Sequence, residues 1–256
     1  KGANQAVAAA RDGAAVIFAG AVGRAGFAAV ATSALREAGV DLSRLAEVDA
    51  PTGCASICVD RAGRNQIAVA PGANLLACAS QVEDAALGPG VTLLMQMEVP
   101  AAEVAALTAR AQVRGARVVL NLAPPGEIGV DALRALDLLV LNEHEAAVLA
   151  ACLGVATEAP ALRAALGPDV AVTLGEAGAE AAVASGVIRV PGMRVTAVDT
   201  TGAGDCWCGV LCAALDRGLA MEAAMHRACA AAALACTRAG AASAMPHSRE
   251  IDAALR

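Results

Sequence analysis

The sequence predicts an α/β fold in which a mostly parallel sheet carries helices on both faces, with a small β appendage. Short apolar runs alternate with longer segments of helical periodicity, which is typical of parallel strands joined by crossover helices. Hydrophobic residues make up 57% of the chain, and many are Ala or Val, as expected for a buried parallel sheet against Ala-rich helices. One segment, residues 54–70, breaks the alternation and is assigned to a β projection.

In the first part of the chain, the periodicity of the apolar residues predicts the helices and strands, and turn-forming residues predict where each element ends. Gly39 ends the second helix, and the turn-rich Arg61-Ala62-Gly63-Arg64 separates two short alternating runs, which indicates a hairpin. The expected elements are a helix over 3–11, a strand over 14–19, a helix over 27–38, and hairpin strands over 54–60 and 66–70.

After the hairpin the strand–helix rhythm is regular. We expect a strand over 91–97, a helix over 101–114, a strand over 116–121, a short helix over 130–136, a strand over 138–141, a helix over 144–151, a strand over 170–174, a hairpin over 179–190, and helices over 203–216 and 221–236. No repeat or low-complexity linker divides the chain, so a single domain over residues 1–256 is expected.

Charge and composition exclude several classes of protein. The net charge is −6 and there are only three aromatic residues, Phe18, Phe27 and Trp207, so a nucleic-acid-binding protein is excluded. The longest run without charges, 65–82, is interrupted by Pro and Gly, which argues against a membrane-spanning helix. No secretion leader is visible and the nine cysteines are odd in number, so we expect reduced thiols, mostly in the core, and a cytoplasmic protein.

Residues 199–205, Asp-Thr-Thr-Gly-Ala-Gly-Asp, precede a long apolar helix. A Gly-Ala-Gly turn at a helix start leaves backbone N–H groups free, and these donors, with the helix dipole, form an anion site. The carboxylate of Asp205 beside that site suits a base that takes a proton from an alcohol while a phosphoryl group is transferred. The alternative is structural, with Asp205 as a capping residue of a Gly-rich helix start.

Other polar residues follow the ends of predicted strands, where ligands bind to parallel sheets. Glu98 could accept hydrogen bonds from hydroxyl groups, or it could cap the following helix. Asn142 and Glu145 share one helix face and could hold a hydrated Mg²⁺, or they could form a capping box. The glycines of the segment 173–178 allow a ligand to approach the backbone, although such turns are common.

Several motifs, in one order and at one set of spacings, resemble the ribokinase branch of the PfkB carbohydrate-kinase family. The most specific are Lys1-Gly2-Ala3-Asn4-Gln5-Ala6 and the 199–205 stretch. The supporting motifs are Pro51-Thr52-Gly53, Pro71-Gly72-Ala73-Asn74, Asn142-Glu143-His144-Glu145-Ala146, Val172-Thr173-Leu174-Gly175 and Thr237-Arg238-Ala239-Gly240-Ala241. The resemblance covers essentially the whole chain and implies the Rossmann-like ribokinase fold with a β lid.

The resemblance implies a role for each matching position around the transferred phosphate and the sugar. Asp205 is similar to the base that deprotonates the sugar 5-hydroxyl, and Gly202, Ala203 and Gly204 to the anion hole. The positions that match the sugar site are Lys1, Gly2, Asn4 and Glu98.

The resemblance also implies an ATP site with Mg²⁺, and a K⁺ site. The positions that match nucleotide binding are Asn142, Thr173, Gly175, Gly178, Gly204 and Cys229, with Asn142 and Glu145 linked to Mg²⁺ and phosphate. The positions that match the K⁺ site are Asp199, Thr201, Ala235, Arg238, Gly240 and Ala244. The hairpin at 54–70 would be the lid over the sugar and the contact of a homodimer.

The sequence departs from the family pattern on the sugar side. The first strand of the family, with its two glycines and a sugar-binding Asp, is expected to be missing before Lys1, which would leave a neighbouring strand unpaired. Arg24 stands where relatives have an acid, Cys229 where many have Asn or His, and Ala244 where Ser is frequent. The phosphoryl-transfer centre matches fully.

These observations predict an ATP-dependent kinase that acts on the 5-hydroxyl of D-ribose to give D-ribose 5-phosphate. One alternative is a PfkB kinase for another furanose or a nucleoside. The other is a non-catalytic relic that binds a nucleotide or a sugar, which the incomplete sugar side and Arg24 would favour.

Overall fold

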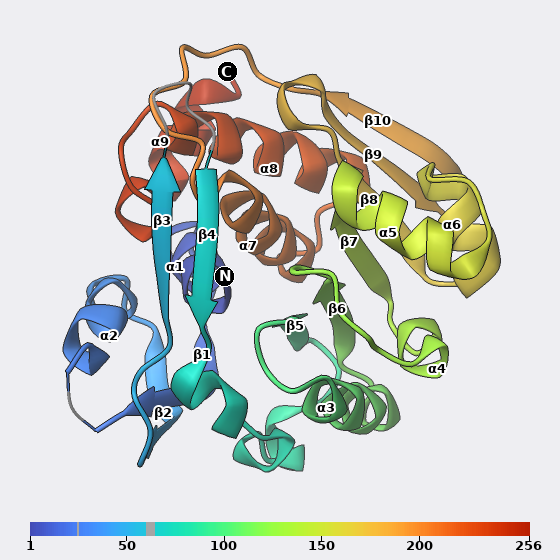
Figure 1. Ribbon diagram of the computed structural model, residues 1–256. Coiled ribbons are helices and arrows are strands. Elements are labelled where there is room, and N and C mark those ends of the chain that lie inside the picture. The colour runs from blue at the N-terminus through green and yellow to red at the C-terminus, as the bar shows by residue number, and fades with distance from the viewer. Residues whose placement is uncertain (25, 60–64) are drawn as a thin grey trace.

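The computed structural model describes residues 1–24, 26–59 and 65–256 and shows a main sheet of mixed direction (Figure 1). Four strands run parallel, and two antiparallel strands extend one edge. In spatial order the sheet is β10 (Gly186–Pro191), β9 (Gly178–Val183), β8 (Asp169–Thr173), β7 (Leu138–Asn142), β6 (Arg117–Asn121) and β5 (Thr92–Gln96). The expected mostly parallel sheet and the hairpin over 179–190 are therefore confirmed.

A second, two-stranded parallel sheet is formed by β1 (Ile17–Gly23) and β2 (Asp41–Val48). The first strand was expected over 14–19, but pairing with β2 carries it to Gly23. β2 itself was not predicted, because Asp41, Ser43, Arg44 and Glu47 interrupt its apolar positions. In the described part of the chain β1 pairs only with β2 and β5 pairs only with β6, so the two sheets are not joined by strand pairing.

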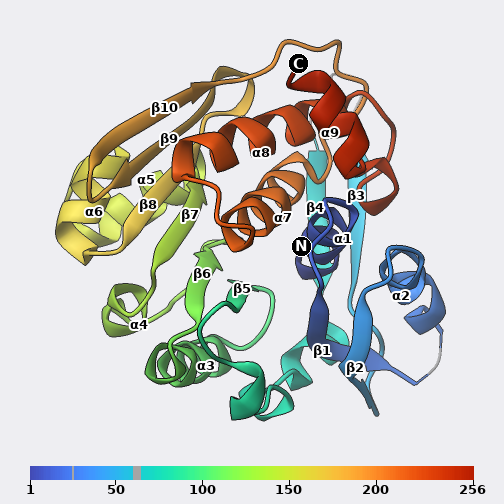
Figure 2. The same ribbon diagram turned by 180° about the vertical axis from the view of Figure 1, so that it is seen from behind.

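Helices cover both faces of the main sheet, because alternate strand residues point to opposite sides. On β7, Leu138 and Val140 join one core cluster, and Leu139 and Leu141 join the other. The first cluster is covered by α1 (Gly2–Arg11), α2 (Ala28–Glu37), α7 (Ala203–Asp216) and α8 (Met221–Cys236), and Figure 2 shows α7 and α8 in front of the strands. The second is covered by α3 (Ala101–Arg114), α4 (Val130–Arg134), α5 (Glu143–Leu153) and α6 (Ala159–Leu166).

The remaining elements are short. α9 (Ser248–Ala254) packs on α8. The described residues also form 3-10 turns in the connections, at η1 (Gly72–Leu76), η2 (Ala79–Gln81), η3 (Asp84–Ala86), η4 (Gly175–Ala177) and η5 (Ala242–Ala244). Neither α6 nor α9 was predicted. The described part of the chain contains no helix with the length and apolar character that a bilayer crossing requires.

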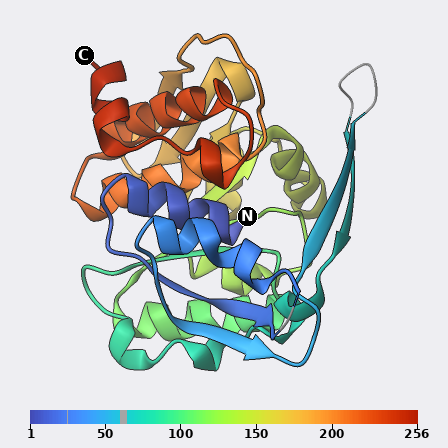
Figure 3. The same cartoon turned by 90° about the vertical axis from the view of Figure 1, so that its left-hand side faces the viewer.

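The predicted hairpin is present as β3 (Cys54–Val59) and β4 (Asn65–Ala70), which pair antiparallel and stand away from the body of the molecule (Figure 3). Its predicted turn at 61–64 lies outside the described residues. Hydrogen bonds fix the base of the hairpin, since Ala73 N donates to Pro51 O at 2.8 Å and Gly23 N donates to Thr52 Oγ1 at 3.0 Å. The hairpin is thus anchored to the carboxyl end of β1.

Candidate active site

The carboxyl ends of the parallel strands bring four polar residues to one edge of the main sheet. Glu98 follows β5, and Asn121, Asn142 and Thr173 end β6, β7 and β8. Gln96 is the register partner of Asn121, and Asn142 is that of Thr173, so these side chains belong to adjoining strand ends. This is the edge at which parallel sheets bind ligands.

The segment 199–205 forms the predicted Gly-rich start of α7. Gly202 is the N-cap with φ of +77°, and a Cβ there would lie 3.2 Å from Ala241. A side chain at this position would therefore meet both backbone strain and a close neighbour. Among the described residues, the amides of Gly204 and Asp205 have no hydrogen-bond acceptor, so this helix start offers free donors to an anion.

The carboxylate of Asp205 lies in the first turn of α7 and is 7% exposed. Asn4 Nδ2 donates to its Oδ2 at 2.9 Å, and Gln5 Nε2 donates to its Oδ1 at 3.1 Å. Both donors come from α1. The two helices can approach closely because α7 has a glycine, Gly209, at the contact, where a Cβ would overlap the carbonyl oxygen of Gln5. The structure thus brings two predicted residues, Asn4 and Asp205, into direct contact.

Gln5 connects Asp205 to the strand ends and was not predicted as a site residue. Its Nε2 also donates to Asn121 Oδ1 at 3.0 Å, and its Oε1 accepts from Gln96 Nε2 at 2.7 Å. Gln5 is 1% exposed, so its own side chain is closed to water, whereas Gln96 is half-buried. Asn121 could have been found by the rule that identified Glu98 and Asn142, namely a polar residue at the end of an apolar strand.

The predicted sugar-side residues lie on adjoining elements. Glu98 follows β5, and a Cβ at Gly2 would lie 2.7 Å from Gln96 Oε1, so the start of α1 adjoins the end of β5. Arg24 is exposed just beyond β1.

Asn142 and Glu145 form the capping box that was the structural alternative to a Mg²⁺ site. Glu145 N donates to Asn142 Oδ1 and Asn142 N donates to Glu145 Oε2, both at 2.8 Å. Burial raises the pKa of the Glu145 carboxyl above its ordinary value, and the nearby Asp205 adds to this. Glu145 Oε1 accepts no hydrogen bond from the described residues. This oxygen lies beside the strand ends and is available to accept a hydrogen bond from the water shell of a cation.

The predicted nucleotide-site residues lie at the ends of β8 and in α8. Thr173 Oγ1 donates to Leu141 O at 3.3 Å, and Gly175 has open space where a Cβ would be. Gly178 has φ of +104°, and a Cβ there would overlap the backbone of Val190, so its glycine is required by the packing of β10. Cys229 accepts a hydrogen bond from Trp207 Nε1 at 3.4 Å in the core, and burial raises its pKa.

Asp199 joins the predicted segments of the K⁺ site. Its two carboxylate oxygens accept from Thr201 N and Gly240 N, each at 2.9 Å, and hydrogen bonds from Thr201 and Gly240 lower its pKa to about 2. Ala235 O accepts from Arg238 N, while the Arg238 guanidinium turns to Glu250.

Ala244, the last predicted K⁺-site residue, is buried in the 3-10 turn η5. A carboxylate with backbone carbonyls is a donor set that suits a hard cation. No cluster of three His, Cys, Asp or Glu side chains able to bind a metal occurs in the described ranges 1–24, 26–59 and 65–256.

Comparisons with known proteins identify the family of the chain. Residues 1–248 match the pfkB family of carbohydrate kinases. The chain is 34% identical to the ribokinase of Haemophilus influenzae, over 98% of this chain and 84% of that protein, and 32% identical to that of Bacillus subtilis, over 100% and 86%.

Solved structures give the same result. The ribokinase of Thermotoga maritima superposes with a TM-score of 0.91 at 31% identity, over 99% of this chain and 86% of that one. The Arabidopsis thaliana ribokinase, solved with ribose and ATP, has a TM-score of 0.87 at 26% identity, over 100% and 86%. By sequence and fold, the chain belongs to the pfkB family of carbohydrate kinases.

Proposed function

We propose that this kinase transfers the γ-phosphoryl group of ATP to the 5-hydroxyl of D-ribose and releases D-ribose 5-phosphate and ADP. The observation that carries the proposal is the buried carboxylate of Asp205, held by Asn4 and Gln5 beside the free amides at the start of α7. Relatives that are 32–34% identical over nearly the whole chain are ribokinases, which supports ribose as the acceptor.

In this mechanism Asp205 accepts the proton of the sugar hydroxyl as the oxygen attacks the γ-phosphorus. The backbone donors of the 202–204 turn stabilise the charge on the transferring group, and the helix dipole adds to their effect. Within this turn Ala203 N already donates to Thr200 O at 3.2 Å, so the amides of Gly202 and Gly204 are the ones available among the described residues. The amides of Asn4 and Gln5 fix the direction of the carboxylate without neutralising it. Lys1, Gly2, Asn4 and Glu98 surround the sugar.

The nucleotide lies along the carboxyl ends of β7 and β8 in this proposal. Asn142, Thr173, Gly175 and Gly178 line its path, with Gly204 at the phosphates and Cys229 on the adenine side. Mg²⁺, held through water by Asn142 and Glu145, would neutralise charge on the phosphates of ATP. The free Oε1 of Glu145 supports this assignment.

A potassium ion would bind between residues 199–201 and 235–244 and would order the anion hole. The contact of Asp199 with both Thr201 and Gly240 supports it. We further propose a cytoplasmic homodimer that associates through the lid hairpin. The exposed Val69 and the isolation of β3–β4 from other strands support a partner there, because a two-stranded hairpin is marginally stable alone.

The test is product formation by the purified protein with ATP, MgCl₂ and KCl. D-ribose, 2-deoxy-D-ribose, D-fructose and inosine are compared, and the phosphorylated position is identified by ³¹P and ¹³C NMR. We expect the highest kcat/KM with D-ribose and phosphate on its 5-oxygen. A higher kcat/KM with fructose or inosine would identify that compound, and not ribose, as the preferred substrate. Stabilisation by ATP without turnover of any sugar would favour a nucleotide-binding protein without catalysis.

A further inference from the structure

Arg11, the last residue of α1, binds the turn 242–245 through three backbone carbonyl groups. Its Nη1 donates to Ala242 O at 3.0 Å, to Ser243 O at 3.3 Å and to Met245 O at 2.7 Å. Among the described residues these carbonyl oxygens are the acceptors of the guanidinium, and none of its acceptors is a carboxylate. One nitrogen thus holds three carbonyl groups of the same turn, which fixes the turn to the end of α1.

The turn that Arg11 binds packs against Gly202, the N-cap of α7. Met245 is 1% exposed, and its Cε lies 3.3 Å from the place that a Cβ at Gly202 would occupy. The Cβ of Ala241, just before the turn, lies 3.2 Å from the same place. The amide of Gly202 is one of the two available donors of the 202–204 turn, so the orientation of a donor of the anion hole depends on where the turn 242–245 lies.

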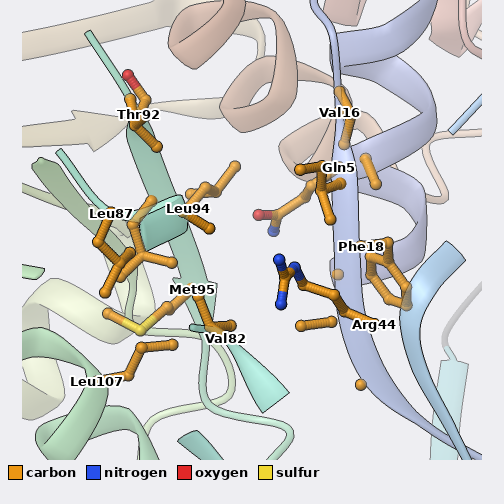
Figure 4. Close-up of a pocket in the computed structure, with 18 of the residues that line it drawn as sticks. Gln5, Val16, Phe18, Arg44, Val82, Leu87, Thr92, Leu94, Met95 and Leu107 are labelled. Carbon is orange, nitrogen blue, oxygen red and sulfur yellow. The ribbon is translucent and has the colours of Figure 1, made fainter. Parts of the chain in front are cut away.

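The helix α1 carries both Arg11 and the partners of the candidate base. Asn4 and Arg11 are seven residues apart, so they share one face of the helix and lie about 10 Å apart along its axis. Asn4 donates to Asp205 at 2.9 Å. Gln5, which also donates to Asp205, points from α1 toward the cavity beside β5 (Figure 4). One short helix therefore holds the base at its first turn and the turn 242–245 at its last.

We propose that Arg11 is a positioning residue for phosphoryl transfer, which anchors the turn 242–245 to α1 and thereby keeps Gly202 in place beside Asp205. The inference rests on the proposed function, in which Asp205 accepts the proton and the 202–204 turn stabilises the transferring group. Arg11 touches neither the sugar nor the nucleotide in this proposal. Its effect is to fix the distance between the base and the anion hole, because a single helix positions both.

The location of Arg11 favours an effect on catalysis over an effect on folding. The side chain is half-buried, so water can replace part of the hydrogen bonding that its removal takes from the three carbonyl groups. The rate of phosphoryl transfer depends steeply on geometry, since a displacement of about 1 Å can cost about 10²-fold. Loss of Arg11 should therefore change the anion hole more than it changes the stability of the chain.

The experiment compares the binding of ADP with the binding of ADP plus aluminium fluoride, which mimics the transferring phosphoryl group. Calorimetry is performed with D-ribose, MgCl₂ and KCl present. Arg11→Gln should weaken the binding of ADP–aluminium fluoride by about 10–100-fold and that of ADP by less than about threefold, because the anion hole acts on the transferring group. The value of kcat should fall by a similar factor, with a smaller change in the KM for D-ribose.

Two variants separate positioning from the loss of a positive charge. Arg11→Lys keeps a nitrogen with three N–H donors for the three carbonyl groups, and it should restore the affinity for ADP–aluminium fluoride to within about fivefold of the parent protein. Arg36→Gln removes an exposed arginine from the last turn of α2, so it matches the loss of charge at a helix end. This control should leave both affinities and kcat unchanged.

A second site on the same path tests whether the turn carries the effect. Met245→Ala removes the side chain that reaches Gly202 and should also weaken the binding of ADP–aluminium fluoride. If Arg11 and Met245 act through one turn, the double variant should lose little more than either single variant. Amide hydrogen exchange in the absence of ligands should become faster by about 3–10-fold at residues 202–206 of Arg11→Gln, with no change in the interior of α8.

Three results would overturn the proposal. The first is an equal loss of affinity for ADP and for ADP–aluminium fluoride in Arg11→Gln. The second is the same loss in Arg36→Gln, which would assign the effect to net charge. The third is full additivity of Arg11→Gln and Met245→Ala.

Failure of the proposed function would give a different result. In that case the parent protein would bind ADP–aluminium fluoride no more tightly than ADP. The exchange of residues 202–206, measured without ligands, then decides whether Arg11 anchors the turn. Unchanged exchange in Arg11→Gln would reject the anchoring role, and faster exchange confined to these residues would support it.

Discussion

The side-chain amide of Gln5 donates to Asp205 Oδ1 at 3.1 Å and so fixes the candidate base against the strand ends. The same amide donates to Asn121 at the end of β6, and Gln96 at the end of β5 holds the Gln5 oxygen. The direction of the Asp205 carboxylate is therefore set by two strands as well as by its own helix. A base on a helix start needs such support, because a displacement of about 1 Å can cost about 10²-fold in rate.

Replacing Gln5 by Met should lower kcat by about 10–100-fold with a smaller change in the KM for ATP. Met fills the same volume but leaves Asp205, Asn121 and Gln96 without their partner, so the free energy of unfolding should fall by about 1–3 kcal/mol as well. Steady-state kinetics and urea denaturation measure the two effects. Loss of stability with unchanged kcat would show that Gln5 is structural only.

Gln5→Glu tests the positioning role through pH. A second carboxyl at this position would face Asp205, and two adjacent carboxylates share a proton, so the pair should titrate at higher pH. The acidic limb of the kcat/KM profile should move to higher pH relative to the parent protein. An unchanged profile would mean that Gln5 does not control the base.

Asp205→Asn should lower kcat by roughly 10²–10⁴-fold while the affinity for ATP stays nearly constant, because Asn keeps the shape but not the basicity. Turnover is measured by ADP release and affinity by calorimetry. Glu222→Gln, at an exposed position of α8, is the control for a neutralised carboxylate and should keep full activity. Turnover of the Asp205→Asn variant within a few-fold of the parent would remove Asp205 from the mechanism.

Most of the fold could be predicted because the parallel strands are apolar throughout and their helices have clear limits. The helix at 101–114 was predicted to the residue, and α7 and α8 were predicted around the bounds that the structure gives them. β2 and α6 were missed for different reasons. β2 carries too many polar residues for a buried strand, and the short, Ala-rich α6 has Pro160 in its first turn. β2 is decided by pairing with β1, a contact between segments that are distant in sequence, whereas α6 is decided by packing on β8, the strand that follows it.

At the site, motifs singled out Asn4 and Asp205, but not the residues that connect Asp205 to the strand ends. Gln5, Gln96 and Asn121 meet only when α1 crosses the ends of β5 and β6. The capping box of Asn142 and Glu145 is a local pattern, so the sequence supported it and a Mg²⁺ role equally, and the hydrogen bonds show that the box is formed.

Asp12→Ala should reduce the free energy of unfolding by about 3–5 kcal/mol without a direct effect on the site. The Asp12 side chain is fully buried at the end of α1. Arg217 Nη2 donates to it at 2.7 Å and Arg227 Nε at 3.0 Å. Removal of the Asp12 carboxylate leaves the positive charge of Arg227, a side chain that is 8% exposed, with fewer negatively charged partners. Asp131→Ala, at an exposed carboxylate, is the control and should leave the urea midpoint unchanged.

Potassium should raise kcat several-fold by ordering residues 199–205. The rate is measured with KCl and with choline chloride at constant ionic strength, and Asp199→Ala should remove the difference. Because the pKa of Asp199 is about 2, the carboxylate stays ionised and the potassium effect should be constant above about pH 4. Equal rates of the parent protein in both salts would exclude a specific site.

Glu145→Gln should raise stability near pH 7 and lower activity. Burial raises the folded-state pKa of Glu145, so the folded protein favours the protonated form. The contribution of the protonated Glu145 carboxyl to the free energy of unfolding is therefore complete below its ordinary pKa of 4.5. This contribution is lost as pH rises through the higher pKa of the folded state. Gln is neutral at every pH and can still accept from Asn142 N, so Tm should increase at pH 7 and match the parent at about pH 4.

The activity of the same variant tests the cation role of Glu145. If the carboxylate holds hydrated Mg²⁺, Glu145→Gln should weaken the apparent affinity for Mg²⁺ by about 10–100-fold, because partners beyond the direct ligands typically contribute that much. Glu143→Gln, at an exposed carboxylate in the same first turn of α5, is the matched control and should change neither Tm nor Mg²⁺ affinity appreciably. A more stable Glu145→Gln protein with unchanged Mg²⁺ dependence would restrict Glu145 to its capping role, whereas a less stable protein at pH 7 would contradict the raised pKa.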